Sequence, residues 1–313
     1  MKPTLLVLIP LIDEIRAQLA RTFDIVYAPT AEARALAIAE HRDAVRAVLT
    51  NGTTGLTAAE IDRLRKLEFV SALGAGYENI DVVHALARDI VVVNGAATND
   101  DCVADHAFAL LIATVRDIVE LDAACRAGVW RDALPMQPNF SGKRLGIAGL
   151  GNIGQKLARR ALGFDIEVGY HNRKPREGVP YRCFGSLTEL AQWCDYLVVT
   201  VPGGAATLHL IDRAVLDALG PHGYLVNVSR GSVVDTQALA HALSTNALAG
   251  AGLDVYEGEP EPPQALLHLK NVVLTPHVAG RSPEAIAASV QLFLDNAARH
   301  FAGEAVLTPV RTR

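Results

Sequence analysis

A glycine-rich turn between an apolar run and an amphipathic segment places the strongest constraint on the fold of this chain. Residues 149–154 have the spacing G-x-G-x-x-G. Residues 145–148 before the turn have the composition of a buried parallel strand, and residues 155–162 after it have that of an amphipathic helix. A strand, a glycine turn and a helix in this order place a dinucleotide pyrophosphate at a helix N-terminus, where unpaired amides and the helix dipole favour an anion.

The three glycines have separate roles in such a turn. Gly149 would allow the tight turn, Gly151 the close approach of the pyrophosphate, and Gly154 the close packing of the helix on the strand. Glycines are common in loops, so the motif alone is weak, and the flanking strand and helix give it weight. The sequence therefore predicts a dinucleotide-binding unit.

The end of the next expected strand, residues 166–170, indicates which dinucleotide binds. Sites that prefer NAD usually have an acidic residue here, about 20 residues beyond the glycines, for the ribose 2′-hydroxyl. This chain has neutral Asn172, followed by Arg173 and Lys174. A carboxylate would repel a 2′-phosphate, whereas Arg173 can bind it through two hydrogen bonds with Lys174 nearby. A solvated basic turn is the alternative, but the pattern favours NADPH.

Composition narrows the class of protein further. The chain has 313 residues, half of them hydrophobic, and a formal net charge of −5, which argues against a nucleic-acid partner. Its four cysteines are scattered without metal-ligand spacing, so no metal is predicted and reduced thiols in the cytosol are expected. Residues 4–9 are apolar but acidic residues follow, which is typical of a first strand rather than a signal peptide. Residues 107–115 are too short to span a bilayer. We expect a soluble cytoplasmic protein.

Expected strands and helices alternate along the whole chain. Strands are predicted at residues 4–8, 24–27, 45–49, 69–73, 90–93, 145–148, 166–170, 196–201, 223–228, 250–253 and 272–274, and helices at 12–21, 31–41, 58–66, 101–126, 155–162 and 283–301. This alternation predicts an α/β fold whose parallel sheets are covered on both faces. We predict a first domain of residues 1–97 plus 283–313 and a dinucleotide domain of residues 98–282.

Three residues in the second half have the chemistry of a catalytic set. Arg230, Glu259 and His277 each follow a predicted strand, at the strand end where open α/β sheets bind their ligands. An arginine can bind the carboxylate and carbonyl of a 2-oxo acid. A protonated histidine can donate to the alkoxide that hydride transfer creates, and a carboxylate behind it fixes its tautomer and favours its charged form. Each residue alone could be an ordinary surface group, but together behind a dinucleotide motif they indicate an oxidoreductase.

Five segments carry a resemblance to a known family. Residues 73–81, 149–154, 227–235, 252–260 and 275–280 resemble, in order, the motifs of the D-isomer-specific 2-hydroxyacid dehydrogenases, and within them the glyoxylate/hydroxypyruvate reductase branch. The resemblance implies two Rossmann-like lobes, a flavodoxin-like substrate domain and an NAD(P)-binding domain, with the active site in a cleft between them. It also implies a homodimer formed through the nucleotide domain.

Residue roles follow from the same resemblance. It implies that Arg230 binds the substrate, that His277 is the acid/base and Glu259 its partner, and that the amides of Ala75 and Gly76 hold the substrate carboxylate. Asp254 matches the residue that accepts a hydrogen bond from the nicotinamide carboxamide. Cofactor contacts are implied for Gly149, Gly151, Asn152, Ile153, Gly154, Asn172, Arg173, Lys174, Val201, Pro202, Val228, Ser229, Arg230, Asp254, His277 and Gly280.

The expected reaction is the NADPH-dependent reduction of a small 2-oxo acid to the D-2-hydroxy acid, with NADH as an alternative cofactor. His106, on the long predicted helix, is expected to be structural. Residues 132–139 vary among family members in their substrate contacts, and Leu134 and Met136 suggest an apolar element near the distal end of the substrate.

Several other functions stay open. Enzymes for bulkier oxo acids such as phenylpyruvate or hydroxyphenylpyruvate, the phosphoglycerate dehydrogenases, and relatives that oxidise formate or phosphite share this fold. A non-enzymatic, dinucleotide-sensing corepressor on the same fold is the alternative from another class. The lack of long disordered flanks in the sequence argues against it.

Overall fold

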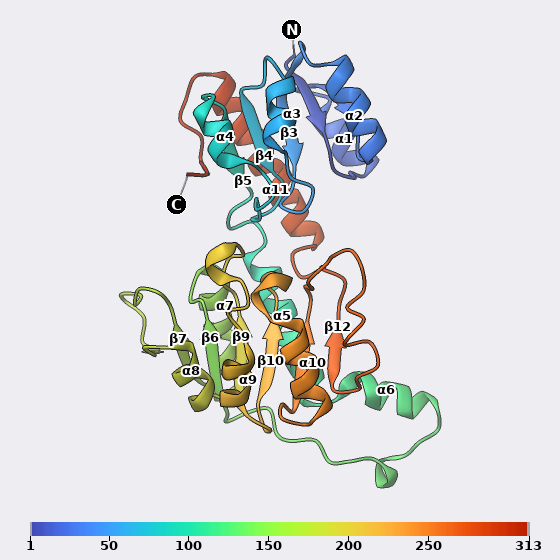
Figure 1. Cartoon of the computed structure of the whole chain (residues 1–313), viewed down its shortest axis with the longest axis vertical. Helices are drawn as coiled ribbons and strands as arrows, with labels where there is room; N and C mark the ends of the chain where they lie inside the picture. Colours follow the sequence, from blue (N-terminus) through green and yellow to red (C-terminus); the bar gives the residue numbers. More distant parts are fainter. Residues whose placement is uncertain (1, 312–313) are drawn as a thin grey trace. The chain divides into compact units, whose positions relative to one another are not determined.

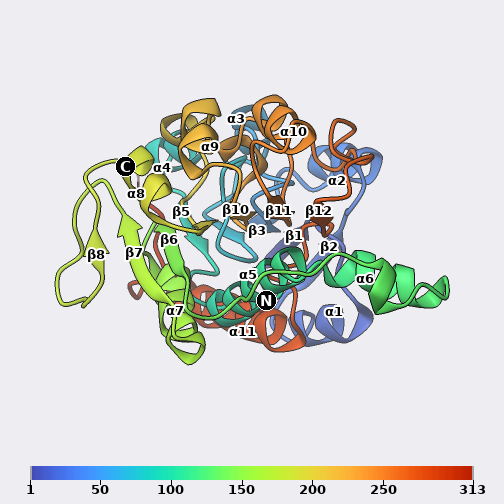
Figure 2. The same cartoon turned by 90° about the horizontal axis from the view of Figure 1, so that it is seen from below.

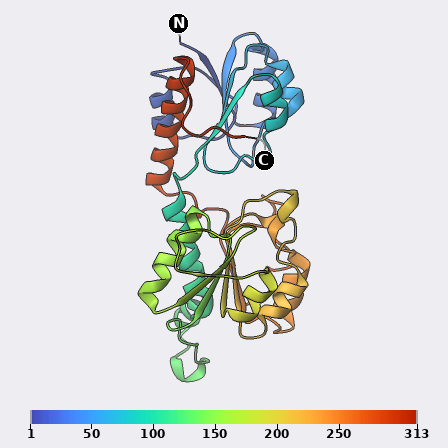
Figure 3. The ribbon, with the colours of Figure 1, turned by 90° about the vertical axis from the view of Figure 1, so that its left-hand side faces the viewer.

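The computed structural model describes residues 2–311, and the chain divides into two compact units, residues 1–99 with 281–313 and residues 100–280. Each unit is built on one sheet, and every strand pairing within the two sheets is parallel. Helices cover both faces of each sheet (Figure 3). The predicted α/β fold class is therefore confirmed.

The first unit contains a sheet in the order β2-β1-β3-β4-β5, which is the flavodoxin-like order. Strands β3, β4 and β5 of this sheet are labelled in Figure 1. Helices α1 and α11 pack on one face, where Phe293 lies with its ring centre 5.6 Å from that of Phe23, and α2, α3 and α4 cover the other face. Its strands are β1 Thr4–Val7, β2 Asp24–Tyr27, β3 Val45–Thr50, β4 Phe69–Ala72 and β5 Val91–Asn94. Its helices are α1 Asp13–Leu19, α2 Ala31–Glu40, α3 Ala58–Arg63, α4 Val82–Ala87 and α11 Pro283–Phe301.

The second unit contains a sheet in the order β12-β11-β10-β9-β6-β7-β8. Because strand order reverses beside β6, the glycine turn after β6 lies at the switch point where open sheets bind ligands. Helices α5 and α7 pack on one face, and α8, α9 and α10 on the other. Its strands are β6 Arg144–Ala148, β7 Glu167–His171, β8 Arg182–Cys183, β9 Tyr196–Val199, β10 Tyr224–Asn227, β11 Gly250–Leu253 and β12 Val272–Leu274. Its helices are α5 Asp100–Val115, α6 Ile118–Arg126, α7 Asn152–Ala161, α8 Leu187–Trp193, α9 Arg213–Leu219 and α10 Thr236–Ser244.

The long helix predicted over residues 101–126 is wrong, because the chain forms two helices there, α5 and α6. Asp117 between them has a left-handed backbone with φ of 53°, a conformation that aspartate tolerates better than most residues. Just before it, the Thr114 hydroxyl donates to the Leu110 carbonyl, a local bond that bends helices. Helix α6 then extends away from the sheet without a buried residue (Figure 2).

Local capping explains where other elements begin. The Thr57 hydroxyl accepts from the Glu60 amide, and the Glu60 carboxylate accepts from the Thr57 amide, so a capping box begins α3. None of the helices within residues 2–311 is both long and apolar enough to cross a lipid bilayer.

Candidate active site

Arg230, Glu259 and His277 lie in the loops that follow three neighbouring strands of the second unit, β10, β11 and β12. These strands are parallel and adjacent, so their carboxyl ends meet at one edge of the sheet. The local fold therefore brings the three predicted side chains to the same edge.

His277 and Glu259 form a hydrogen-bonded pair. His277 Nδ1 lies 2.6 Å from Glu259 Oε2, and Glu259 Oε1 accepts from the Tyr256 amide at 2.8 Å. Burial alone would raise the pKa of Glu259, but the bonds from His277 and Tyr256 and the charge of Arg230 outweigh it, so this pKa lies below its ordinary value. The ionised carboxylate fixes the proton on Nδ1. The other ring nitrogen, Nε2, forms no hydrogen bond with any residue in 2–311 and can exchange a proton with a ligand.

Asp254 holds the turn on which His277 stands. Its backbone carbonyl accepts from the His277 amide at 2.8 Å, and its carboxylate accepts from the amides of Val278 and Ala279, each at 2.9 Å. The residue is 1% exposed. Burial would raise the pKa of Asp254, yet its hydrogen bonds keep the pKa below the usual value. Asp254 was expected at the nicotinamide, and here its two carboxylate oxygens are bonded within the protein.

Arg230 is placed by close backbone packing. Its guanidinium Nη1 donates to the Ser229 carbonyl at 2.6 Å. A Cβ added to Gly203 would lie 2.7 Å from Arg230 Cγ, so the loop after β9 packs directly on the arginine stem. A Cβ added to Gly231 would lie 1.9 Å from the carbonyl carbon of Tyr256, so only glycine fits where the Arg230 loop passes the Glu259 loop.

The glycine turn fits a dinucleotide. Gly149 has φ of 99°, and a Cβ added to Gly154 would lie 2.5 Å from the Gly149 carbonyl oxygen, as expected for tight packing of α7 against the turn. A Cβ added to Gly151 would meet nothing within 4 Å, so this side of the turn is open. The amides of Asn152 and Ile153, in the first turn of α7, are unpaired among residues 2–311 and can bind a pyrophosphate.

The residues after β7 divide into fixed and solvated groups. Asn172 Oδ1 accepts from the Leu150 amide at 2.7 Å, so this side chain braces the glycine turn. Arg173 and Lys174 are exposed. Arg176, which the sequence reasoning missed, donates from Nη1 to the Leu150 carbonyl at 3.2 Å, and a third basic residue in the run was the available signal.

The remaining predicted cofactor residues line the same edge of the second unit or lie near it. Val201 follows β9, and its side chain would be 2.9 Å from a Cβ added to Gly149. Val228 and Ser229 follow β10 and are buried, and the Ser229 hydroxyl donates to Asn227 Oδ1. Pro202 accepts from the Thr207 hydroxyl through its carbonyl, and Gly280 is the last residue of this unit.

Sequence reasoning also missed a pair beside the catalytic loops. His209 Nε2 lies 2.7 Å from Glu257 Oε1, while Glu257 Oε2 accepts from the Thr236 amide at 3.1 Å. The hydrogen bond to Glu257 raises the pKa of His209. This pair connects the loop after β9 to the segment that carries Glu259. The only sequence signal for the pair was the position of Glu257, two residues before Glu259.

In the first unit, Ala75 and Gly76 lie in the turn after β4. Asn94 Nδ2 donates to the Ala75 carbonyl at 2.7 Å, and Gly74 has φ of 97°. The amides of Ala75 and Gly76 donate no hydrogen bond within residues 2–311. Two adjacent free amides can converge on an anion.

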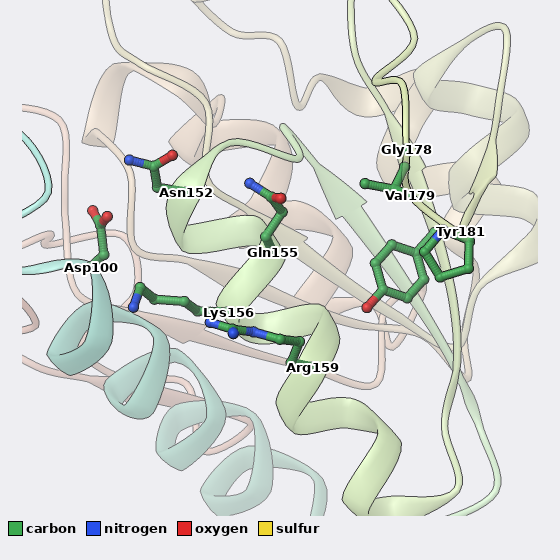
Figure 4. A pocket seen from close by; sticks show the side chains of 9 residues that line it. Asp100, Asn152, Gln155, Lys156, Arg159, Gly178, Val179 and Tyr181 are labelled. Atoms are coloured by element: carbon green, nitrogen blue, oxygen red, sulfur yellow. The ribbon is translucent and has the colours of Figure 1, made fainter.

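Two cavities of the second unit lie apart from the catalytic side chains. One of about 380 Å³ lies along α7, where Gln155, Lys156 and Arg159 stand beside Tyr181 of the segment after β7 (Figure 4). The other, of about 490 Å³, is lined by Leu134 together with Tyr224 and Gly250. Tyr224 and Gly250 begin β10 and β11, so Leu134 lies at the opposite ends of these strands from the catalytic loops. Leu134 is therefore distant from the catalytic loops of its own unit, and its contact with the substrate stays a prediction.

A family model matches more than half of the chain. Residues 108–279 match the model described as D-isomer specific 2-hydroxyacid dehydrogenase, NAD binding domain. The match contains the glycine turn and all three of the catalytic candidates.

Three known proteins are similar over nearly the whole length. The hydroxyphenylpyruvate reductase of Plectranthus scutellarioides is 39% identical over 306 residues, covering 97% of this chain and 98% of that protein. The 2-ketogluconate reductase of Gluconobacter oxydans is 39% identical over 311 residues, covering 99% of each. The solved structure of the NADPH-dependent glyoxylate/hydroxypyruvate reductase of Sinorhizobium meliloti, in complex with NADP and malonate, is 39% identical with a TM-score of 0.92, covering 100% of this chain and 99% of that one.

Proposed function

Because this chain belongs to the D-isomer-specific 2-hydroxyacid dehydrogenase family, we propose that it uses NADPH to reduce a small 2-oxo acid, of the glyoxylate or hydroxypyruvate type, to the D-2-hydroxy acid. The observation that carries the proposal is the pairing of His277 Nδ1 with Glu259 Oε2 at 2.6 Å, at the strand ends where Arg230 also lies. A carboxylate-oriented imidazole and an arginine are the groups that this reduction needs.

In the proposed mechanism the nicotinamide, when bound, supplies the hydride. Arg230 binds the carboxylate of the oxo acid and polarises its carbonyl. As negative charge develops on the carbonyl oxygen, protonated His277 donates the Nε2 proton to it, giving the hydroxyl group. Glu259 keeps the imidazole in the required orientation and stabilises its charged form. In the oxidative direction, His277 removes the same proton.

We assign residues 100–280 to cofactor binding and the unit of residues 1–99 with 281–313 to substrate binding. The match of residues 108–279 to an NAD-binding domain and the open glycine turn support the first assignment. The free amides of Ala75 and Gly76 support the second, because they can bind the substrate carboxylate.

The preference for NADPH rests on charge. Asn172 is neutral where a carboxylate would select the ribose hydroxyl, and Arg173 and Lys174 are exposed cations that can bind a 2′-phosphate. The similar enzyme of Sinorhizobium meliloti is described as NADPH-dependent and was solved with NADP. NADH is the alternative cofactor, used less efficiently.

A bulkier substrate is the second candidate. Similar proteins are named for hydroxyphenylpyruvate and 2-ketogluconate, both larger than glyoxylate. The catalytic groups would be the same for these substrates, because each is a 2-oxo acid, and only the groups around the distal end would differ.

We also propose a cytoplasmic homodimer formed through the second unit. Its four cysteines are free thiols, which suits a reducing compartment. Ile118, Val119, Trp130 and Met136 are exposed apolar side chains on α6 and the segment after it, with Met136 99% exposed. Such a patch is typical of an association surface. Light scattering on the wild type and on Trp130→Ser tests this proposal, since a monomeric wild type would refute it.

The deciding experiment measures initial rates with glyoxylate, hydroxypyruvate, phenylpyruvate and 2-ketogluconate, each with NADPH and with NADH. We expect the highest kcat/KM for a small acid with NADPH. A preference for phenylpyruvate or 2-ketogluconate would move the substrate class to the second candidate. Tight NADPH binding without turnover of any acid would refute the reductase proposal and favour a dinucleotide sensor.

A further inference from the structure

His106 on α5 is connected to the buried carboxylate of Asp254 through a threonine hydroxyl, and His106 Nε2 itself lies 3.5 Å from Asp254 Oδ1. His106 Nε2 lies 2.9 Å from Thr275 Oγ1, and this hydroxyl donates to Asp254 Oδ1 at 2.6 Å. A hydroxyl can donate only one hydrogen bond, and the Thr275 hydroxyl donates it to the Asp254 carboxylate. Its oxygen must therefore accept the hydrogen bond from His106. The contact therefore fixes His106 as the donor, with a proton on Nε2.

The carboxylate at the other end of this relay holds the catalytic turn. Asp254 accepts, through its backbone carbonyl and its two carboxylate oxygens, from the three successive amides of His277, Val278 and Ala279. His277 has φ of 52°, a left-handed backbone that is costly for a residue other than glycine. The turn keeps this conformation because Asp254 satisfies all three amides from one side.

Thr275 also connects to the partner of His277. Its backbone carbonyl accepts from the Tyr256 hydroxyl at 2.6 Å, and the Tyr256 amide donates to Glu259 Oε1 at 2.8 Å. Burial raises the pKa of Tyr256, so its hydroxyl stays a donor. Thr275 therefore contacts both Asp254, which holds the turn of His277, and Tyr256, which holds Glu259.

We propose that His106 is a positioning residue for the reaction: by donating to Thr275 it orients the hydroxyl that holds Asp254, and through Asp254 the turn that carries His277. The inference rests on the proposed function, because it makes His106 a support for the catalytic pair of His277 and Glu259. It changes the expectation from the sequence that His106 only supports the core.

Two substitutions separate a positioning role from simple packing. His106→Leu removes the donor while keeping an apolar side chain of similar size, and His106→Gln keeps an N–H donor. We expect His106→Leu to lower kcat about tenfold at saturating NADPH, since small misplacements of a catalytic group are costly, and His106→Gln to retain most of the activity. The Kd for NADPH should stay within about twofold in both variants. His241→Leu, the same change at an exposed position on α10, is the control and should leave kcat unchanged.

A double-mutant cycle tests the route. Thr275→Val removes the hydroxyl and leaves only the longer direct contact of His106 with Asp254, so His106→Leu should lower kcat much less in the Thr275→Val background than in the wild type. Hydrogen–deuterium exchange gives a readout without turnover: the amides of Val278 and Ala279 should exchange faster in both single variants than in the wild type.

Equal losses of kcat in His106→Leu and His106→Gln, additive effects with Thr275→Val, or unchanged exchange at residues 278 and 279 would each overturn the proposal. A raised Kd for NADPH with unchanged kcat would overturn it too, by placing His106 at the cofactor. If His106→Leu does not fold, the proposal is tested by the kcat and the amide exchange at residues 278 and 279 of Thr275→Val and His106→Gln. Failure of the proposed function shows separately, as a wild type that turns over none of the oxo acids yet keeps protected amides at 278 and 279.

Discussion

Glu259 Oε2 lies 2.6 Å from His277 Nδ1, and its other oxygen is held by the Tyr256 amide. The carboxylate is therefore fixed from two sides and can orient the imidazole without rearrangement. Both side chains are only partly buried, 38% exposed for His277 and 21% for Glu259, so a ligand can reach the histidine while the carboxylate stays behind it.

Replacing Glu259 with glutamine should preserve the fold and impair turnover. Glutamine retains a hydrogen-bonding group but loses the charge that favours the imidazolium, so kcat/KM should fall by roughly 10²- to 10⁴-fold. Steady-state rates between pH 5 and 9 and NADPH titration would measure these effects. Glu261→Gln, an exposed neighbour in the same loop, is the control, and wild-type kinetics for Glu259→Gln would exclude the assigned role.

Gly231→Ala should displace Arg230 relative to the catalytic pair of His277 and Glu259. The added Cβ would lie 1.9 Å from the carbonyl carbon of Tyr256, a backbone atom, so one of the two loops must move. We expect kcat/KM to fall about 100-fold, because Arg230 and Glu259 lie on the two displaced loops. Gly163→Ala, where a Cβ meets nothing within 4 Å, should leave kinetics unchanged. Normal kcat/KM for Gly231→Ala would show that the packing of these loops does not set the geometry.

The edge of the sheet at which the catalytic candidates lie was predictable from the sequence. Alternating apolar and helical segments predicted parallel strands, and the carboxyl ends of adjacent parallel strands meet at one edge. Arg230, Glu259 and His277 each follow such a strand in the structure. The apolar runs also gave several bounds correctly, including β2, β11, β12 and α11.

What the sequence missed depends on which way a side chain points. A buried aspartate after a strand can face a ligand or its own chain, and only the fold shows that Asp254 holds the amides of residues 277–279. Likewise, the sequence placed Asn172 among the cofactor residues, and only the fold shows that its side-chain oxygen also accepts from the Leu150 amide. The break between α5 and α6 depends on a left-handed residue, Asp117, which helical periodicity does not register.

Asn172→Asp should shift cofactor preference towards NADH. Aspartate retains an oxygen to accept from the Leu150 amide, so the glycine turn should stay intact. Its negative charge, however, repels a 2′-phosphate, and its carboxylate can accept a hydrogen bond from a ribose hydroxyl. We expect the KM for NADPH to rise about tenfold or more while the KM for NADH falls. Asn172→Ala, which removes the brace without adding charge, should weaken both cofactors equally. Parallel changes in Asn172→Asp would contradict this reading of the site.

Arg173→Ala should weaken NADPH much more than NADH. A charge-assisted pair with phosphate corresponds to roughly a 10- to 100-fold change in affinity, and NADH lacks that phosphate. Calorimetric binding of 2′,5′-ADP and 5′-AMP isolates the effect from catalysis. Arg159→Ala, in the cavity along α7, is the comparison and should leave both affinities unchanged. If Arg159→Ala weakened 2′,5′-ADP and Arg173→Ala did not, the 2′-phosphate would bind in that cavity instead.

Asp254→Asn should destabilise the protein in a pH-dependent way. The pKa of Asp254 is lowered in the folded protein, because the hydrogen bonds to its carboxylate outweigh the opposing effect of burial. A group with a depressed folded pKa stabilises the fold above its unfolded pKa of about 3.9, and this contribution is lost as pH falls through the folded value. At pH 7 we therefore expect the variant to lose about 1–3 kcal/mol, since an amide NH₂ would face the backbone donors that the carboxylate satisfies.

Urea denaturation of the wild type and Asp254→Asn at pH 7, 5 and 3.5 measures this difference. The gap in unfolding free energy should be full at pH 7 and 5 and should narrow at pH 3.5, where protonation of Asp254 in the unfolded chain opposes folding of the wild type alone. Asp295→Asn, an exposed position on α11, should show no comparable gap. A gap that widened with acid would mean that Asp254 is protonated in the folded protein, and the turn of His277 would then depend on neutral hydrogen bonds rather than on a carboxylate.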